Sequence, residues 1–192
     1  STNSRNRVFF TEGNELKIRI HDPEKLVDPS LILYTPLRVL GDDLILTNGD
    51  QTDTVYEGMR RGLSFEASLE SRTFEPDAPN FTPRISGVFH LGEPPCYKLS
   101  ILKAGDPDGR TSVRACFAYE PFPGKGHLIH TYACDGTPLP SFAGEPKAAA
   151  TRDDIDAFSE ALWGSLNANN RVALYVRYTD LVSGSYADRT FN

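Results

Sequence analysis

The sequence predicts an α+β protein, a layered sandwich of mainly antiparallel strands with a few flanking helices. Three observations support this prediction. Strand-like alternation of apolar and polar residues is more frequent than helical periodicity, helical segments flank pairs of strands, and turn residues separate the strands. The 192 residues contain no internal repeat, low-complexity stretch or linker. We therefore expect a single domain over residues 1–192.

The first 47 residues predict two β-hairpins. Arg7–Glu12 and Glu15–Ile20 alternate around Gly13-Asn14, a pair that is typical of tight hairpin turns. Residues 31–40 and 44–47 form a second apolar pair around a Gly-Asp-Asp turn. Pro36 lies inside the first of these strands, so it is expected at a bulge or an edge.

Two helices are predicted next. Asp50 follows a strand and is a suitable N-cap for a helix that runs to about Arg61. A second helix is expected over residues 64–72, because Phe65 and Leu69 are four residues apart and share a face. A proline-rich loop over residues 74–83 follows.

The second half of the chain predicts an antiparallel meander and a final helix and strand. The strand-like segments of the meander are residues 85–90, 97–103, 113–119 and 127–132. Thr151 is the expected N-cap of a helix whose Ile155, Phe158 and Leu162 share one face. A last strand is predicted over residues 171–179.

Composition excludes several classes of partner. With 26 acidic and 20 basic residues and a net charge of -6, the chain lacks the basic field that nonspecific nucleic-acid binding uses. No stretch of 18 apolar residues predicts a membrane span. Three widely spaced cysteines, Cys96, Cys116 and Cys134, match neither a disulfide framework nor a zinc motif, so reduced thiols and a cytoplasmic location are expected.

The first candidate site segment is 47–54, where a strand end runs into a helix start. It is dense in hydroxyl, amide and carboxylate groups. Backbone N–H groups at a helix N-terminus bind anions, although Asp50 and Asp53 would repel a phosphate there. The alternative interpretation is simply a capped helix.

The second candidate segment is the loop over residues 75–84. It holds Glu75, Asp77, Asn80 and Arg84, and its prolines would fix their directions with little ordering entropy left to lose. The alternative is a solvated turn in which Glu75 and Arg84 form a surface ion pair, and such a pair stabilises little.

Arg5 and Arg7 form the third candidate. In an extended strand they would point to the same face, where both could bind one phosphate. The alternative is a frayed basic terminus. Tyr34 ends an apolar segment, and its phenol needs a hydrogen-bond partner, either in the core or in a catalytic site.

No metal or nucleotide-triphosphate motif is present in the sequence. The four histidines lack H-x-H or H-E-x-x-H spacing, so metal catalysis is not expected. Gly124 and Gly126 flank Lys125 without forming a P-loop, and G-x-G-x-x-G does not occur. We expect no metal and no cofactor.

Five short segments, in order and spacing, resemble the archaeal-type inosine-monophosphate (IMP) cyclohydrolases. They are Ser4-Arg5-Asn6-Arg7, Tyr34-Thr35-Pro36-Leu37-Arg38, residues 47–54 (Thr-Asn-Gly-Asp-Gln-Thr-Asp-Thr), Thr82-Pro83-Arg84-Ile85 and Thr131-Tyr132. The resemblance covers roughly the first 135 residues. Two departures from the family pattern are Phe81, inserted before Thr82, and Thr35-Pro36, which leave the shape of the pocket open.

The resemblance implies a fold similar to the N-terminal-nucleophile hydrolases, a four-layer αββα sandwich of mainly antiparallel sheets. Family members carry a strand pair upstream of the region that matches Arg5-Asn6-Arg7. On this resemblance, roughly forty residues and their N-terminal strands are expected to be missing from this chain.

The activity implied by the resemblance is closure of the purine ring of a formylated aminoimidazole carboxamide ribotide, with loss of water. Tyr34 would donate to the formyl oxygen or shuttle the proton, Glu75 or Asp77 would act as base, and Arg84 would stabilise the oxyanion. Arg5 and Arg7 would bind the phosphate. The remaining residues expected to bind substrate are Arg38, Asn48, Thr52, Asp53, Thr82 and Tyr132.

Two other classes of function remain open at this stage. One is a self-processed amide hydrolase or amide-forming enzyme, in which Ser1 attacks a carbonyl and the Asn48 amide helps to form an oxyanion hole. It predicts a separate upstream peptide of the same precursor. The other is a noncatalytic module that binds a purine ribotide. Edge strands are compatible with a homo-oligomer in any of these cases.

Overall fold

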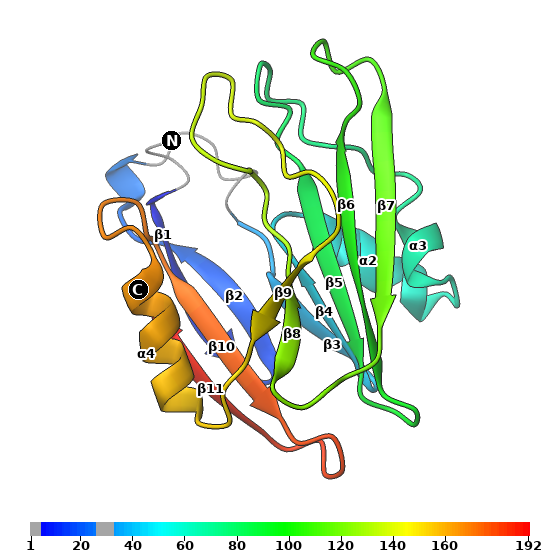
Figure 1. Ribbon diagram of the computed structural model, residues 1–192, viewed down its shortest axis with the longest axis vertical. Coiled ribbons are helices and arrows are strands. Elements are labelled where there is room, and N and C mark those ends of the chain that lie inside the picture. The colour runs from blue at the N-terminus through cyan, green and yellow to red at the C-terminus, as the bar shows by residue number, and fades with distance from the viewer. Residues whose placement is uncertain (1–4, 26–32) are drawn as a thin grey trace.

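A seven-stranded antiparallel sheet dominates the computed structural model, which describes residues 5–25 and 33–192 (Figure 1). Its strands lie side by side in chain order: β1 (Arg7–Glu12), β2 (Glu15–Ile20), β3 (Leu37–Leu40), β4 (Asp43–Thr47), β5 (Arg84–His90), β6 (Cys96–Ala104) and β7 (Ser112–Tyr119). A short 3-10 helix, η1 (Pro23–Lys25), follows β2. The predicted α+β class, the first hairpin and the β5–β6–β7 meander are confirmed.

Two helices cover one face of this sheet. They are α2 (Gln51–Arg60) and the short α3 (Phe65–Ser68), whose N-cap Ser64 accepts a hydrogen bond from the N–H of Ala67 at 3.1 Å. Apolar side chains from both helices pack on alternate residues of the strands. The core formed in this way consists of Ile45, Val55, Phe65, Leu69, Val88 and Leu102.

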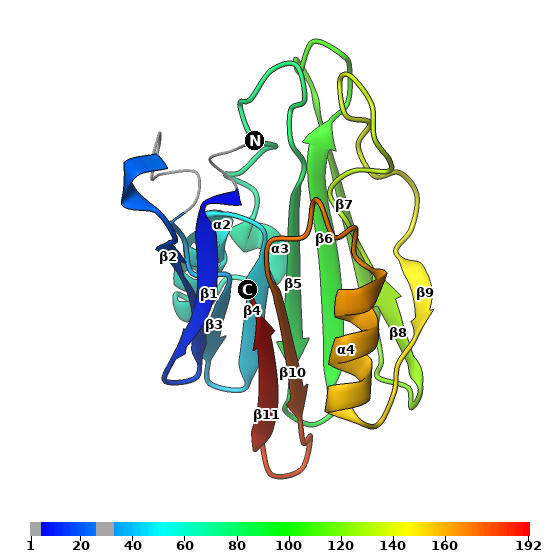
Figure 2. The ribbon, with the colours of Figure 1, turned by 90° about the vertical axis from the view of Figure 1, so that its left-hand side faces the viewer.

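The opposite face is covered by two separate two-stranded sheets. One pairs β8 (Lys125–Leu128) with β9 (Lys147–Ala150), and the other pairs β10 (Leu174–Thr179) with β11 (Tyr186–Phe191). The last helix, α4 (Ile155–Ser165), packs on β10 and β11, where its Trp163 ring stacks on Phe191 at 5.5 Å. Figure 2 shows α2 and α3 on one side of the large sheet, and α4 with β8 and β9 on the other.

Several boundaries in the first half differ from prediction. The strand predicted over residues 31–40 begins only at Leu37, directly after Pro36, whose missing N–H cannot join a ladder. Its first two residues, Leu31 and Ile32, lie outside the described residues. Helix α3 ends at Ser68 instead of continuing to residue 72.

In the second half, β8 does not extend the meander. It pairs with β9, an alanine-rich strand that showed no alternation, and residues 129–132 leave the strand as a loop. The cap of α4 is Asp154, which accepts a hydrogen bond from the N–H of Ala157 at 2.6 Å, so Thr151 is not the cap. Strand β10 begins at Leu174 instead of residue 171, and β11 was not predicted.

The C-terminal residue ties the β10–β11 sheet to the edge of the large sheet. The Asn192 side chain accepts from the N–H of Phe9 at 2.7 Å and donates to its carbonyl oxygen at 3.1 Å. The Tyr186 hydroxyl also donates to the Gly13 carbonyl at 3.2 Å. None of the helices in the described ranges is long and apolar enough to cross a membrane.

Candidate functional site

The candidate site lies where β4 ends and β5 begins. Because these neighbouring strands are antiparallel, Thr47 pairs with Ser86, and Asn48 comes beside Pro83 and Ile85. The Asn48 side chain donates to the Pro83 carbonyl at 3.0 Å and accepts from the Ile85 N–H at 2.9 Å. Its oxygen also accepts from Gln51 Nε2 at 2.9 Å. The Asn48 amide therefore holds the two strand ends and the start of α2 together.

Arg84 is the buried cation of this site, with 9% of its surface exposed. Its Nη1 donates to Asp50 Oδ1 at 2.5 Å and to Gln51 Oε1 at 2.8 Å. Arg72 Nη2 lies 2.8 Å from the other oxygen of Asp50. Burial disfavours ionisation of the Asp50 carboxyl, but these two guanidinium groups outweigh it and lower its pKa.

The position of Asp50 corrects one detail of the predicted helix start. Asp50 is the N-cap residue of α2, as the sequence predicted, but its side chain makes no capping hydrogen bond. Its carboxylate is held by Arg84 and Arg72 instead. Two charge-assisted contacts outcompete one bond to a backbone N–H.

Glu75 approaches the same cation from the proline-rich loop. Its Oε1 lies 3.9 Å from Arg84 Nη1, and 22% of its side chain is exposed. Burial raises the pKa of the Glu75 carboxyl, the Arg84 charge opposes this shift, and the negative charges of Asp77 and Asp50 add to it. The result is a carboxylate that binds a proton more readily than an ordinary surface glutamate.

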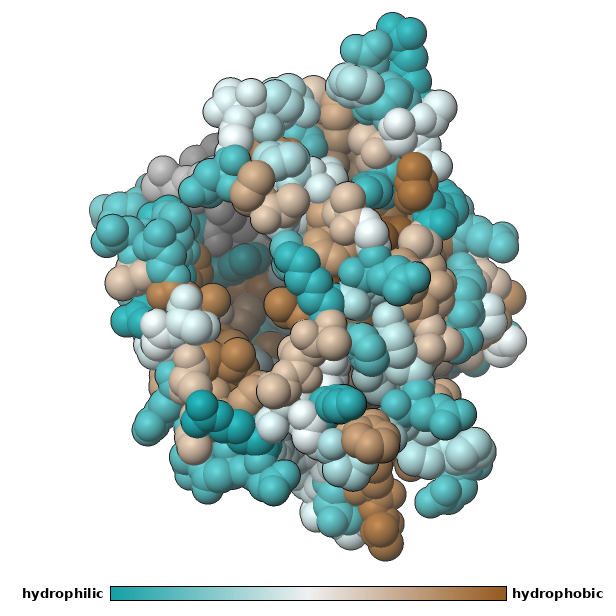
Figure 3. All heavy atoms as spheres, viewed as in Figure 1, coloured by the Kyte–Doolittle hydropathy of each residue, from teal (hydrophilic) through white to brown (hydrophobic). Residues whose placement is uncertain are grey.

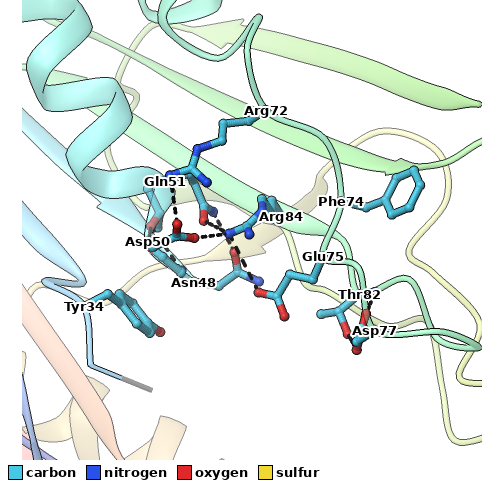
Figure 4. Close-up of polar contacts among 12 residues, drawn as sticks. Tyr34, Asn48, Asp50, Gln51, Arg72, Phe74, Glu75, Asp77, Thr82 and Arg84 are labelled. Carbon is cyan, nitrogen blue, oxygen red and sulfur yellow. Dashed lines mark hydrogen bonds and ion pairs between the residues drawn. The ribbon is translucent and has the colours of Figure 1, made fainter. Parts of the chain in front are cut away.

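Tyr34 and Arg7 complete the polar group on the side of β1. Arg7 Nη1 donates to the Tyr34 hydroxyl at 3.4 Å, and Arg7 Nε is buried without a hydrogen-bond partner. Burial raises the pKa of the Tyr34 phenol, although the Arg7 charge opposes this shift. In Figure 4, Tyr34 and Glu75 lie on the same side of the Asp50–Arg84 pair.

Asp77, Thr82 and Tyr132 form a smaller hydrogen-bonded group in the same loop region. Asp77 accepts from the Thr82 N–H at 2.6 Å and also from its hydroxyl, so its carboxylate is already engaged. The Thr82 hydroxyl lies 2.6 Å from the Tyr132 hydroxyl. Burial raises the pKa of Tyr132, and the hydrogen bond with Thr82 opposes this shift.

The inserted Phe81 does not join the polar group. Its φ of 44° places it in the left-handed region, which is uncommon for a bulky residue. The ring packs edge-on against Phe74 at 5.4 Å and lies over Gly109, where an added Cβ would come within 2.7 Å. The insertion is therefore accommodated by an aromatic pair and a glycine from the β6–β7 turn.

Other residues predicted to bind substrate make hydrogen bonds or ion pairs within the protein. Arg38 and Asp53 bond to each other at 2.9 Å, and the Arg38 guanidinium lies 3.5 Å from the centre of the Tyr56 ring. Thr52 is fully buried and bonds to Thr47 and to the Gly49 carbonyl oxygen.

Arg5 and Arg7 do not share a strand face. Strand β1 begins only at Arg7, and Arg5 donates to the Asn169 carbonyl at 2.9 Å and to the Asn170 side chain. The alternation that predicted a common phosphate site therefore does not apply to this pair. Ser1 lies outside the described residues.

An apolar cavity of about 280 Å³ begins next to Asn48 on the face opposite the helices. It runs between the large sheet and Ile129, which belongs to the loop that also carries Tyr132. Figure 3 shows a hollow with apolar walls on this side of the molecule, between the β8–β9 and β10–β11 sheets. The other lining residues are Leu46, Thr47, Ile85, Ser86, Gly87, Phe89 and Leu99.

Sequence reasoning missed two members of the site. Gln51 was considered only as part of a helix start, yet it bridges Asn48 and Arg84. Arg72 was assigned to the end of a helix, and no local pattern predicted its pairing with Asp50, which lies 22 positions earlier. Within residues 5–25 and 33–192, no group of three or more His, Cys, Asp or Glu side chains is arranged to hold a metal ion.

Comparisons with known proteins agree with the resemblance in the sequence. An IMP cyclohydrolase from Methanopyrus kandleri is 32% identical over 148 residues, which cover 71% of this chain and 74% of that protein. The family described as IMP cyclohydrolase-like protein matches residues 1–184, a range that includes every described residue of the site. With nearly its whole length matched, the chain belongs to the IMP cyclohydrolase-like family.

Proposed function

We propose that this protein closes the purine ring of a formylated aminoimidazole carboxamide ribotide to give IMP and water. The single observation that carries the proposal is the grouping of Tyr34, Glu75 and Arg84 around the β4–β5 strand ends, beside an apolar cavity. A proton donor, a carboxylate base and a buried cation are the groups that such a condensation needs.

The reaction has two parts. The carboxamide nitrogen attacks the formyl carbon, and this nitrogen loses a proton while the formyl oxygen gains one. The resulting hydroxyl then leaves as water together with the proton of the former formamide nitrogen, as this nitrogen forms a double bond to the same carbon. Because both reacting groups belong to one molecule, a pocket that holds them in contact removes much of the barrier.

Each proposed catalytic role follows from the environment of the residue. The raised pKa of Glu75 makes its carboxylate a better base for the amide proton. The raised pKa of Tyr34 keeps its phenol protonated at neutral pH, so it can donate to the formyl oxygen. The Arg84 charge, 3.9 Å from Glu75, stabilises the developing oxyanion. Asp77 is already bonded to Thr82, so we assign the base to Glu75.

Substrate binding is proposed for the groups that remain. Arg7 carries a buried Nε without a partner and suits the phosphate of the ribotide. Thr82 and Tyr132 offer a pair of hydroxyls to the ribose. The apolar cavity beside Asn48 suits the flat imidazole ring. We place Asn48, Thr52, Arg38 and Asp53 in support of the site, and Arg5 outside it.

The decisive experiment uses protein expressed from its complete reading frame. Its intact mass is measured, and conversion of the formylated ribotide to IMP is followed by absorbance. We expect turnover by an uncut chain. Binding of IMP without turnover would instead support a noncatalytic module. A cut before Ser1 without ring closure would support the amide hydrolase.

Variants then test the catalytic roles. Glu75→Gln should lower kcat by about 10²- to 10⁴-fold, the usual range for loss of a general base, and should remove the acid limb of the pH profile. Tyr34→Phe should lower kcat more than it raises KM. Glu57→Gln is a matched control, because Glu57 pairs with Arg60 on the surface of α2. A Glu75→Gln variant as active as this control would contradict the proposal.

The proposal also covers the four-layer fold, the cellular location and the oligomeric state. We propose that the β8–β9 and β10–β11 sheets together correspond to the second sheet of a four-layer αββα sandwich in one domain. Free Cys96, Cys116 and Cys134 fit a reducing cytoplasm. The β7 edge of the large sheet is available for homo-oligomer formation.

A further inference from the structure

A further cavity lies between the layers toward the start of β4, beside Arg177 of β10. Side chains alternate along this strand. Tyr178 approaches Phe158 of α4, while Tyr175, Arg177 and Thr179 point toward the large sheet and line the space between the layers. Arg177 is thus the one cation on the inner face of β10 within the described chain.

The Arg177 guanidinium is held in place but not neutralised. Its Nε donates to the Tyr175 hydroxyl at 2.7 Å, and its carbon lies 3.9 Å from the centre of the Tyr186 ring. The Tyr175 hydroxyl in turn donates to Asp188 at 2.9 Å. Arg177 Nη2 is buried without a hydrogen-bond partner, and no carboxylate of the described residues lies within 4.0 Å of the group. A charge in this state favours an anion as partner.

The space in front of Arg177 is a cavity with apolar walls. It has a volume of about 240 Å³ and adjoins a more polar cavity of about 370 Å³. The residues that line both are Leu44, Leu91, Arg177, Thr179 and Leu181. The walls opposite Arg177 are four leucines and one aromatic ring from β3, β4, β5 and the residue that follows β5. These residues are Leu37, Leu44, Leu46, Leu91 and Phe89.

This cavity adjoins the cavity beside Asn48, with which it shares Leu46 and Phe89, and extends from it toward the start of β4. It centres on the start of β4 near Leu44, whereas Asn48 lies beyond the end of the same strand. Four residues of extended strand separate these positions, or about 13 Å. The residues assigned to chemistry, Tyr34, Glu75 and Arg84, do not line it.

We propose that Arg177 forms a binding site for a small organic anion. A carboxylate or phosphate group of the ligand accepts hydrogen bonds from Nη2, and a planar apolar body packs between Phe89 and the leucines. Tyr175 and Tyr186 orient the guanidinium from behind, so that little side-chain entropy is lost on binding. Of its lining residues, Leu46 and Phe89 also line the cavity beside Asn48 and the others do not, so we expect the anion to bind without displacing a ring held beside Asn48.

The test uses 4-bromobenzoate and phenyl phosphate as probes with the complete protein. Calorimetry measures their affinity, and the bromine locates the first probe in crystals by anomalous scattering. Benzyl alcohol has the same body without the charge, and inorganic phosphate has the charge without the body. We expect at least one charged probe to bind about tenfold or more tightly than either of these controls. The bromine should lie among Phe89 and the leucines, at the end of the ring away from Arg177. Comparing the two charged probes distinguishes a carboxylate site from a phosphate site.

Variants and competition complete the test. Arg177→Met should weaken the charged probe by about tenfold, whereas Arg171→Met should not, because Arg171 packs on Trp163 outside this cavity. Saturating IMP should leave the affinity unchanged. The proposal is overturned if the bromine lies elsewhere in wild-type crystals, if neither charged probe binds, or if IMP displaces it. None of these readouts depends on turnover, so failure of the cyclohydrolase assay would leave this result interpretable.

Discussion

The two faces of the central strands differ in how they are used. On the helix-covered face, Ile45, Val88 and Leu102 are 0%, 6% and 2% exposed and pack on α2 and α3. On the opposite face of the same strands, Leu46 and Phe89 line cavities, and Phe89 is 36% exposed. Successive side chains of a strand point to opposite faces of the sheet, so neighbouring residues have different roles. One face stabilises the fold, and the other leaves room for ligands.

The largest expected effect is on the free energy of unfolding, and it tests whether the helix-covered face contributes most to stability. Ile45→Ala should lower the free energy of unfolding by about 2–5 kcal/mol, since it leaves a hole in a closely packed core. Leu46→Ala, one residue further along the same strand, should cost only about 1 kcal/mol, because its side chain already borders empty space. Urea denaturation of both variants measures the difference. Equal losses would contradict the contrast between the faces.

The packing of α2 and α4 can be compared through one glycine in each helix. In α2, a Cβ on Gly58 would lie 2.3 Å from Ser68 Oγ and 2.6 Å from its Cβ, so Gly58→Ala should destabilise by about 1–3 kcal/mol. In α4, a Cβ on Gly164 would meet nothing within 4 Å, so Gly164→Ala should stabilise by about 0.5 kcal/mol. Melting temperatures should move in opposite directions. A shift of the same sign in both would show that α2 is not packed more tightly than α4.

The two carboxylates near Arg84 should give opposite pH dependences. The pKa of Asp50 lies below its ordinary value of 3.8, so its contribution to stability is present above that pH and is lost as the pH falls further. The pKa of Glu75 lies above 4.5, so the unfolded chain releases this proton first and stability falls as the pH rises from about 4.5 through the folded pKa. Each effect should be at most about 1 kcal/mol, because both groups are partly exposed.

Unfolding measured between about pH 2.5 and 7 checks both signs. Asp50→Asn should reduce the loss of stability in acid, and Glu75→Gln should reduce the decline above the ordinary pKa of this glutamate. If the two substitutions changed the slope in the same direction, the assignment of opposite environments to these carboxylates would be wrong.

The elements that could be predicted are those set by neighbours in sequence. The turn at Gly13-Asn14 needs a left-handed residue, and Gly13 has a φ of 62°. Helix α2 begins directly after Asp50 as predicted, although the Asp50 carboxylate is bound by Arg84 and Arg72 and does not cap the helix. In contrast, β9 and β11 contain no clear apolar alternation and exist because a partner strand lies beside them.

The sequence predicted which segments contribute polar residues to the site, but not which of these residues contact one another. The segments around Asn48 and Glu75 were identified because polar residues follow apolar strands. Which groups meet depends on the path of the chain between them. Arg72 pairs with Asp50 from the chain that follows α3, which ends at Ser68, and Arg38 of β3 pairs with Asp53 of α2. Residue type alone could not distinguish a supporting ion pair from a contact to substrate.

The Arg38–Asp53 pair gives the smallest expected effect and completes the comparison. Both residues lie beside the helix-covered layer, where the Arg38 guanidinium also contacts Glu15 and the Tyr56 ring. Because the Asp53 side chain is 62% exposed, Asp53→Asn should cost at most about 0.5 kcal/mol of stability. It should leave the KM for the formylated ribotide within about twofold, whereas loss of a charged substrate contact would raise it tenfold or more. An increase of that size, with unchanged stability, would move the substrate site toward the helices.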